Sequence, residues 1–488
     1  MSNVTRRGLI QGAGAAAALA AYSGARELPT SGRPATVDVV VVGAGFAGLT
    51  TARKLTQAGI SVVVLEADDR VGGRTMPGRI VGHVVDLGGQ WVGPGQDHIL
   101  ALAAELGVTT YLQYTAGNHI LDIEGRIATY TEGQNLPLEL PDRMEFNRVT
   151  IALNQLTRTV NVAEPWKTPD AQALDSQTFE TWLQDATTSE PARSTYREIV
   201  RVVYCVDTAQ LSLLSFLLLA ATAEGIIHMI STTGGSQESL LSGGIWQLAD
   251  KMARELGDAV VVDAPVRSIA QNARGVTVTS DAGVWKARLA VVTAPPPLAA
   301  RISYDPPLPQ LRDQLTQRMP MGSIIKVFVQ YRTPFWRQQG LSGSIFSDRI
   351  ETCFWLDWSA PGSTTGTLVG FWAGGGAQAW ADRPAADRRA KVLNDLAFYL
   401  GPHAKNPIHY VERVWPNAPW QRGGYPAVAG PGVLGWFGPA LREPVGRIHW
   451  AGTETADTHI GYVDGAIQSG ERTAQACLNL FRPQRSKP

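Results

Sequence analysis

The stretch from Asp38 to Glu66 constrains the fold more than any other part of the chain, because it reads as strand, turn, helix and strand in succession. Residues 39–42 are four valines, which suit a buried parallel strand. Three glycines follow with G-x-G-x-x-G spacing: Gly43, Gly45 and Gly48. The apolar run 61–65 is typical of a second strand. The pattern therefore predicts a βαβ unit that binds a dinucleotide.

Each residue type in this unit has a physical reason to be there. Gly43 permits a tight turn, Gly45 lets the backbone approach a pyrophosphate, and Gly48 lets the helix pack closely on the strand. The helix N-terminus then presents its partial positive charge to the phosphates. A carboxylate at Glu66 can accept hydrogen bonds from the ribose hydroxyls and disfavours a 2′-phosphate.

Further motifs narrow the choice of dinucleotide. An R-x-G-G-R turn, residues 70–74, follows the second strand and suits a second pass along the pyrophosphate. It is followed by the run DLGGQW at 86–91, and near the C-terminus by AGTET at 451–455 and GYVDGA at 461–466. Together these motifs resemble the flavin-containing monoamine oxidase family, particularly its bacterial, cyclohexylamine-oxidase-like members. The similarity covers nearly everything from Val37 to Leu480.

The resemblance implies FAD as cofactor. Monoamine oxidases of membranes attach FAD through a cysteine immediately before a tyrosine of the substrate site, whereas this chain has Gly424 there. We therefore predict non-covalent FAD. The implied cofactor-binding residues are Gly43, Gly45, Phe46, Ala47, Gly48, Glu66, Ala67, Arg70, Gly73, Arg74, Gly88, Gly89, Gln90, Trp91, Val266, Trp415, Trp420, Gly452, Thr453, Glu454, Tyr462, Val463 and Ala466.

Three residues are predicted to be catalytic by their match to family positions. Tyr425 and Tyr462 correspond to two aromatic rings that enclose the amine, which their quadrupoles can steer. Lys326 corresponds to a lysine that holds a water at flavin N5 and assists proton movement and reoxidation. The alternatives are that both tyrosines are core residues and that Lys326 snorkels to solvent from a strand edge.

The predicted substrate pocket is mostly apolar. It comprises Trp91, Cys205, Met229, Ile230, Gln237, Phe354, Leu356, Phe371, Tyr425 and Tyr462. The matched segments contain no arginine for an α-carboxylate and no acidic cluster for a second cation. The sequence thus favours an apolar primary amine, cyclic or aryl-alkyl, oxidised to an imine that hydrolyses to a ketone or aldehyde plus ammonia. O2 would be the acceptor and hydrogen peroxide the second product.

Three other functions remain open. The enzyme could pass its electrons to a periplasmic carrier instead of O2, as an amine dehydrogenase. It could be an L-amino-acid or polyamine oxidase of the same fold. A flavin-binding protein without turnover is the third alternative, although simple binding requires neither paired tyrosines nor a buried lysine.

The order of elements predicts an α/β fold in two domains whose pieces alternate along the chain. A Rossmann-like FAD-binding domain takes residues 36–111, 242–316 and 415–482. A substrate domain of mixed sheet and helices takes residues 112–241 and 317–414.

Composition excludes several other functions. The 43 Lys and Arg balance the 43 Asp and Glu, so no net charge favours nucleic acid or a membrane surface. Three cysteines lack metal-ligand spacing, so we predict buried thiols and no metal site. The apolar run 211–221 is too short for a membrane span and predicts a core helix. The expected partners are a small amine and O2, and a homodimer is left open.

The N-terminus has the features of an export signal. Arg6 and Arg7 precede an alanine-rich apolar stretch, and small residues at 23–25 offer a cleavage site. We interpret residues 1–25 as a twin-arginine signal peptide, which predicts a periplasmic mature protein beginning near Arg26. The alternative is an N-terminal helix with two adjacent arginines.

Overall fold

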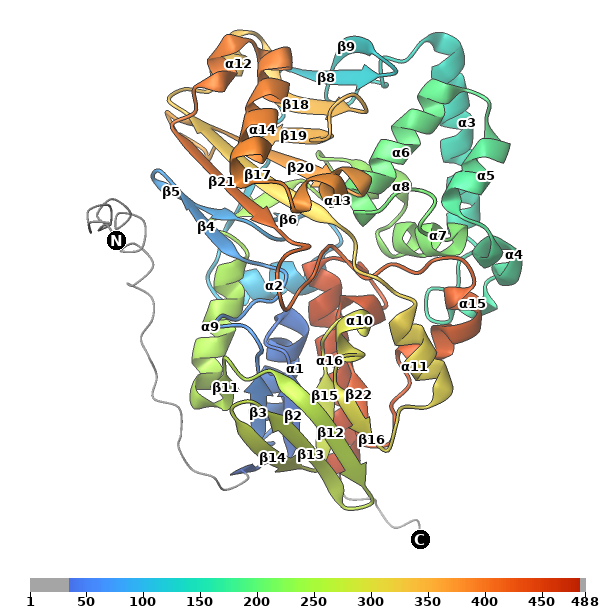
Figure 1. The fold of residues 1–488 in the computed structure, drawn as a ribbon, viewed down its shortest axis with the longest axis vertical. Helices are drawn as coiled ribbons and strands as arrows, with labels where there is room; N and C mark the ends of the chain where they lie inside the picture. Colours follow the sequence, from blue (N-terminus) through green and yellow to red (C-terminus); the bar gives the residue numbers. More distant parts are fainter. Residues whose placement is uncertain (1–34, 483–488) are drawn as a thin grey trace, which may run out of the picture.

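The computed structural model describes residues 35–482. The signal peptide predicted for residues 1–25 lies outside these residues and stays a prediction. Figure 1 shows two halves, one built on a parallel sheet and one on a larger mixed sheet with a group of helices beside it. This is the α/β, two-domain class expected from the sequence.

Five parallel strands form the sheet of the lower half in Figure 1, in the order β11, β3, β2, β15, β22. Helix α1 connects β2 to β3, and α16 packs against α1. The valine-rich strands β2, β3 and β15 are buried along their whole length, as their composition predicts. The bounds are β2 Val39–Val42, α1 Phe46–Gln57, β3 Val62–Leu65, β11 Val260–Val261, β15 Leu289–Val292, β22 Ile448–Trp450 and α16 Val463–Phe481.

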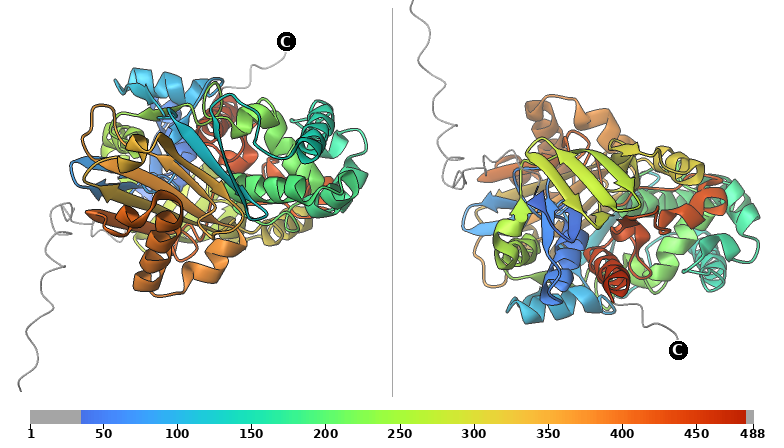
Figure 2. Two further views of the ribbon diagram at one scale, coloured as in Figure 1. Left: turned by 90° about the horizontal axis from the view of Figure 1, so that it is seen from above. Right: turned by 90° about the horizontal axis from the view of Figure 1, so that it is seen from below.

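A second five-stranded sheet covers one face of the parallel sheet. It appears yellow-green beside the blue strands in the right-hand view of Figure 2. Side chains from both sheets share one apolar cluster, which includes Val40, Val63 and Val278. Its strands, in sheet order, are β1 Ala35–Thr36, β14 Gly283–Ala287, β13 Gly275–Ser280, β12 Val266–Asn272 and β16 Ser303–Asp305.

The upper half contains a seven-stranded sheet in the order β21, β17, β20, β19, β18, β8, β9. The sheet is mixed, because β18 pairs with β8 in parallel while the other neighbours are antiparallel. The bounds are β8 Asn118–Ile123, β9 Arg126–Thr131, β17 Ile324–Tyr331, β18 Leu341–Ser347, β19 Phe354–Asp357, β20 Gly366–Ala373 and β21 His409–Val414.

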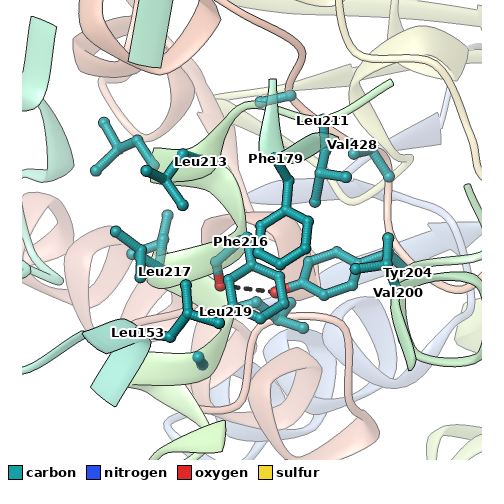
Figure 3. Packing of buried hydrophobic residues seen from close by; sticks show 14 of the residues in the cluster. Leu153, Phe179, Val200, Tyr204, Leu211, Leu213, Phe216, Leu217, Leu219 and Val428 are labelled. Atoms are coloured by element: carbon teal, nitrogen blue, oxygen red, sulfur yellow. Dashed lines mark hydrogen bonds between the residues drawn. The ribbon is translucent and has the colours of Figure 1, made fainter. Parts of the chain in front are cut away.

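Helices α3 to α8 pack around an aromatic and aliphatic core beside this sheet (Figure 3). In that core the Tyr204 hydroxyl donates a hydrogen bond of 2.7 Å to the carbonyl of Phe216. Most of α7 is buried, which confirms the core helix predicted for residues 211–221. The bounds are α3 Leu140–Thr157, α4 Ala171–Ser176, α5 Phe179–Ala186, α6 Glu190–Tyr204, α7 Leu213–Thr222 and α8 Ile226–Ile230.

Further short strands and helices lie beside these sheets.

In residues 35–482, none of the helices combines the length and apolar character that a bilayer crossing needs. The parallel sheet draws on all three stretches assigned to the FAD domain, although the domain boundaries themselves stay predictions. The remaining bounds are β4 Pro77–Ile80, β5 His83–Asp86, β6 Trp91–Val92, α2 Asp97–Glu105, β7 Thr110–Leu112, β10 Ser239–Leu241, α9 Trp246–Leu256, α10 Pro296–Ala299, α11 Gln310–Gln317, α12 Phe335–Gln338, α13 Gly375–Ala381, α14 Ala385–Leu400 and α15 Val433–Phe437.

Candidate active site

A cavity of about 1250 Å³ reaches from the ends of β2 and β3 to the seven-stranded sheet and helix α3. Most small-molecule pockets hold about 300–1,000 Å³, so this one has room for a dinucleotide together with a further ligand. Residues from both ends of the chain line it, among them Gly45, Lys326 and Tyr462.

The glycine-rich turn forms one end of the cavity. Gly43 has φ +104°, and a Cβ at Gly48 would lie 1.9 Å from the carbonyl oxygen of Gly43, so neither position has room for a side chain. At Gly45, by contrast, a Cβ would meet no protein atom within 4 Å. The open space at Gly45 lies on the cavity side, where a phosphate could approach the backbone at the start of α1.

Glu66 lies at the end of β3, buried and lining the cavity. Its carboxylate accepts hydrogen bonds from the backbone N–H of Ala44 at 2.6 Å and of Asp68 at 2.9 Å. Burial raises its pKa, and these two hydrogen bonds oppose that effect. They also fix the carboxylate beside the glycine-rich turn, where a ribose would lie if its phosphates occupied that turn.

The two arginines of the R-x-G-G-R turn have different surroundings. Arg70 donates to the carbonyls of Gly73 and Thr75 at 3.0 and 2.9 Å, so it holds the turn together and does not line the cavity. Arg74 lines the cavity and donates to Glu454 at 2.6 Å and to the Tyr425 carbonyl at 2.7 Å. Glu454 lies behind this contact, outside the lining.

Gln90 carries the clearest sign of a missing ligand group. Its side-chain oxygen accepts a hydrogen bond from Lys326, while its buried Nε2 has no partner among residues 35–482. A buried amide donor without a partner costs free energy, and this one borders the cavity. Together with the open cradle at Gly45, it shows that the residues present fit a bound flavin nucleotide.

Further predicted cofactor residues also line the cavity. Trp415 donates its indole N–H to the Leu87 carbonyl at 2.9 Å, which fixes the ring beside the glycine pair at 88–89. Trp420 has the guanidinium of Arg267 5.8 Å from its ring centre. The other lining residues from the prediction are Phe46, Ala47, Ala67, Gly73, Gly88, Gly89, Trp91, Val266, Gly452, Thr453, Val463 and Ala466.

Tyr425 and Tyr462 both line the cavity and are only partly buried. Burial raises the pKa of Tyr462 to about 12 and also raises that of Tyr425, so both rings are neutral at physiological pH. Tyr462 precedes α16, and its carbonyl accepts a hydrogen bond from Thr453 at 2.9 Å. A role confined to the core does not account for two cavity-facing rings.

Lys326 on β17 is 2 % exposed and lines the same cavity, so it does not snorkel to solvent. Its ammonium donates to the carbonyl of Gly88 at 2.7 Å and to the side chain of Gln90. Three aromatic rings, those of Trp91, Phe328 and Phe371, have centres 5.3–5.8 Å from its Nζ. Burial lowers the pKa of Lys326 to about 7, opposed by the charge of Asp86.

The predicted pocket wall is largely assembled as expected. Phe371 stacks on Phe354 with ring centres 6.0 Å apart and lies 5.6 Å from the ring of Trp91. Gln237 donates to the Met229 carbonyl at 3.0 Å. These residues, with Ile230 and Leu356, line the cavity, whereas Cys205 does not. Cys205, Cys353 and Cys477 are buried free thiols, as predicted, and none of them lines the cavity.

The sequence prediction missed several polar residues of the site. Asp86 is buried, and its carboxylate accepts a hydrogen bond from the Ile245 N–H at 3.0 Å. Glu132 and Arg143 line the cavity from the β9–α3 connection and from α3. Glu132 accepts from the Thr233 N–H at 3.2 Å. No motif marks either residue. Two sequence features could have indicated them. Glu132 is an acidic residue directly after β9, and Arg143 and Asn147 are polar residues spaced i, i+4, which places them on one face of α3. All three line the cavity.

Comparison with known proteins agrees with this geometry. Residues 46–478 match the family described as flavin containing amine oxidoreductase. The chain is 38 % identical over 448 residues to a putative flavin-containing monoamine oxidase, AofH, of Mycobacterium tuberculosis, covering 92 % of this chain and 98 % of that protein. The structure of a putrescine oxidase bound to putrescine superposes with a TM-score of 0.88 at 36 % identity, covering 92 % of this chain and 100 % of the other.

A second solved structure, cyclohexylamine oxidase from Brevibacterium oxydans, superposes with a TM-score of 0.87 at 34 % identity, covering 91 % of this chain and 100 % of the other. The family match spans most of the chain, and the cavity has the cradle and the partnerless amide that a flavin nucleotide would complete. The protein therefore belongs to the flavin-containing amine oxidoreductase family and binds FAD.

Proposed function

We propose that the protein oxidises an apolar primary amine, cyclic or aryl-alkyl, to its imine with O2 as acceptor. The amine loses two electrons and two protons, and O2 gains them to become hydrogen peroxide. Water then converts the imine to a ketone or aldehyde plus ammonia. Bound FAD supplies the two-electron chemistry that connects these half-reactions.

The observation that carries this proposal is one cavity that joins the dinucleotide cradle to Tyr425, Tyr462 and the buried Lys326. Aromatic walls at Phe354 and Phe371 exclude water and favour the neutral form of an entering amine, whose lone pair is needed for oxidation. The two neutral tyrosine rings can orient that amine through their π faces. Lys326 is placed to hold or move a proton at the cavity, because it lines the cavity and its Nζ donates to Gly88 and Gln90, which line it as well.

A second candidate is a difunctional substrate, which the charged outer part of the cavity favours. Glu132 could hold a distant ammonium, as on a diamine. Arg143, whose guanidinium makes no hydrogen bond or ion pair with residues 35–482, could hold a distant carboxylate. The same cavity would then oxidise the near amine. Glu132→Gln and Arg143→Gln would lower the activity on such substrates and leave simple monoamines unaffected.

The decisive experiment is a substrate panel on the purified holoenzyme. Under anaerobic conditions we expect cyclohexylamine, benzylamine or phenethylamine to bleach the flavin absorbance, with putrescine and L-amino acids much slower. Peroxide release after admission of air would support O2 as acceptor. Failure of all three monoamines to bleach would contradict the substrate assignment. Slow reoxidation in air would instead favour a dehydrogenase.

A further inference from the structure

Gln113 is a buried residue that directly follows β7 and lies outside the cavity lining, yet it contacts a residue of that lining. Its side-chain oxygen accepts a hydrogen bond of 2.9 Å from the indole N–H of Trp91. Trp91 begins β6 and lines the cavity. A residue behind the cavity wall therefore fixes one edge of a ring that belongs to the wall.

The NH2 group of the Gln113 amide binds the edge of the seven-stranded sheet's β19. Its Nε2 donates to the carbonyl of Asp357 at 2.6 Å and to the carbonyl of Tyr114 at 3.3 Å. Because a carbonyl can only accept, the NH2 group must face these two oxygens and the amide oxygen must face the indole. The partners of Gln113 thus determine the orientation of its amide.

Asp357 is a fixed anchor for this contact. It is 1 % exposed and ends β19, the strand that carries part of the pocket wall. Its carboxylate accepts from the indole N–H of Trp336 at 2.8 Å and from Arg337 at 2.7 Å. The amide therefore joins the cavity-lining indole to a strand end that is itself held from behind.

The ring that Gln113 holds is one of a row of aromatic rings along the cavity. The centre of the Trp91 ring lies 5.6 Å from that of Phe371, which lies 6.0 Å from that of Phe354. All three residues line the cavity. Trp91 is only partly buried, so packing covers only part of its ring. The hydrogen bond adds the directional constraint that packing leaves out.

We propose that Gln113 is a positioning residue, which holds the Trp91 ring in place and so pre-organises the aromatic wall for the ring of an incoming aryl amine. A side chain that is already ordered loses little further entropy when a ligand packs on it, whereas a loose side chain loses more. Gln113 thereby strengthens amine binding without touching the amine. This inference rests on the proposed function, because it takes the apolar part of the cavity as the amine site.

The test is a calorimetric titration of the FAD-loaded protein with aniline. Aniline is an aryl amine without hydrogen on the carbon that bears its nitrogen, so it can bind but cannot be oxidised at that carbon. In Gln113→Met a side chain of similar length replaces the amide and makes neither hydrogen bond. We expect aniline to bind about two- to tenfold more weakly, the usual effect of ordering one side chain on binding.

A double-mutant cycle makes the result specific to the indole contact. Trp91→Phe keeps an aromatic ring but removes the N–H, so adding Gln113→Met to it should not weaken aniline binding further. Gln330→Met is the matched control. Gln330 is also buried, its amide bonds the backbone of Val81 at 3.1 and 2.9 Å, and it lies outside the cavity lining. This control should bind aniline as the unaltered protein does.

Gln113→Asn serves if the methionine variant does not retain FAD. Its amide is one carbon shorter and cannot keep both contacts, so aniline binding should again weaken. Three results would overturn the proposal: no aniline binding by the unaltered protein, full affinity in the Gln113 variants, or an equal loss from Gln113→Met in the Trp91→Phe background. If no amine bleached the flavin, the proposed activity would fall while the aniline titration still decided the role of Gln113.

Discussion

Glu454 lies outside the cavity lining, but it helps to fix the backbone that carries Tyr425. Its carboxylate accepts from Arg74 and from the Ala427 N–H, and Arg74 in turn donates to the Tyr425 carbonyl. The pair thereby fixes the backbone on both sides of Pro426. Burial raises the pKa of Glu454, but the charge and hydrogen bonds of Arg74 outweigh it, so the net shift is downward. Glu454 is therefore ionised at neutral pH.

Glu454→Gln should leave Arg74 partly unpaired and loosen the segment that carries Tyr425. We expect a loss of about 1–3 kcal/mol in stability, the usual cost of a buried group that loses its charged partner. The amine concentration for half-maximal bleaching should also rise.

Glu471→Gln is the control, because Glu471 pairs with Lys54 and His98 away from the cavity. Thermal unfolding and amine titration of both variants would check the prediction. Equal amine affinity in the two variants would show that Glu454 does not position Tyr425.

At the scale of elements, two positions in the turn between β2 and α1 require glycine for different reasons. At Gly48 a methyl group would collide with the Gly43 carbonyl, which is backbone and cannot rotate away. At Gly45, with φ −74°, a methyl group would meet only the open cavity. One glycine therefore serves the packing of helix on strand, and the other leaves room for the ligand.

The two alanine variants should separate these roles. Gly48→Ala should destabilise the protein by about 1–3 kcal/mol even without FAD, because α1 must move off β2. Gly45→Ala should leave the unfolding temperature of the FAD-free protein unchanged and weaken FAD binding by about tenfold, or about 1.4 kcal/mol. Calorimetry of the FAD-free forms and FAD titration measure both effects. The reverse pattern would contradict the assignment.

Local patterns were enough to predict this part of the fold. The valine strands, the glycine spacing and the apolar helix at 211–221 depend on neighbours within a few residues, and the structure has all three. The contact between Lys326 and the 88–90 segment joins residues more than 230 positions apart. No spacing rule could indicate that pairing, although the motif and the lysine were each recognised.

At the scale of the whole molecule, distant stretches of chain converge on one cavity. Gly45, Val266 and Tyr462 come from the three stretches assigned to the FAD domain, and Lys326 comes from a stretch assigned to the substrate domain. A ligand that contacts all of them stabilises only the folded arrangement. The protein should therefore be markedly more stable with FAD than without it.

The stabilisation of the folded protein by FAD can be measured by removing the nucleotide and adding it back. At a concentration 100 times its dissociation constant, FAD should add about 2.7 kcal/mol to the free energy of unfolding. The midpoint of thermal unfolding should rise with FAD concentration and fall again when the nucleotide is removed. A midpoint independent of FAD would show that the folded protein does not bind FAD in preference to the unfolded chain.

Two charged residues of the cavity, Glu132 and Arg143, were not predicted from the family resemblance. Resemblance located Tyr425, Lys326 and the apolar wall, because these lie in recognisable motifs. Glu132 lines the cavity because of the course of the β9–α3 connection, and Arg143 lines it because of the way α3 is oriented about its axis. Charges set by tertiary placement can redirect substrate preference without changing any motif.

Helix α16 packs directly on α1, and the Thr51 hydroxyl donates to the Gly470 carbonyl at 3.1 Å. The first helix after the glycine turn therefore finds its partner only when synthesis has reached residue 470. A ribosome-bound chain shorter than this lacks one side of the nucleotide cradle. We therefore expect the chain to capture its cofactor only after α16 has been synthesised.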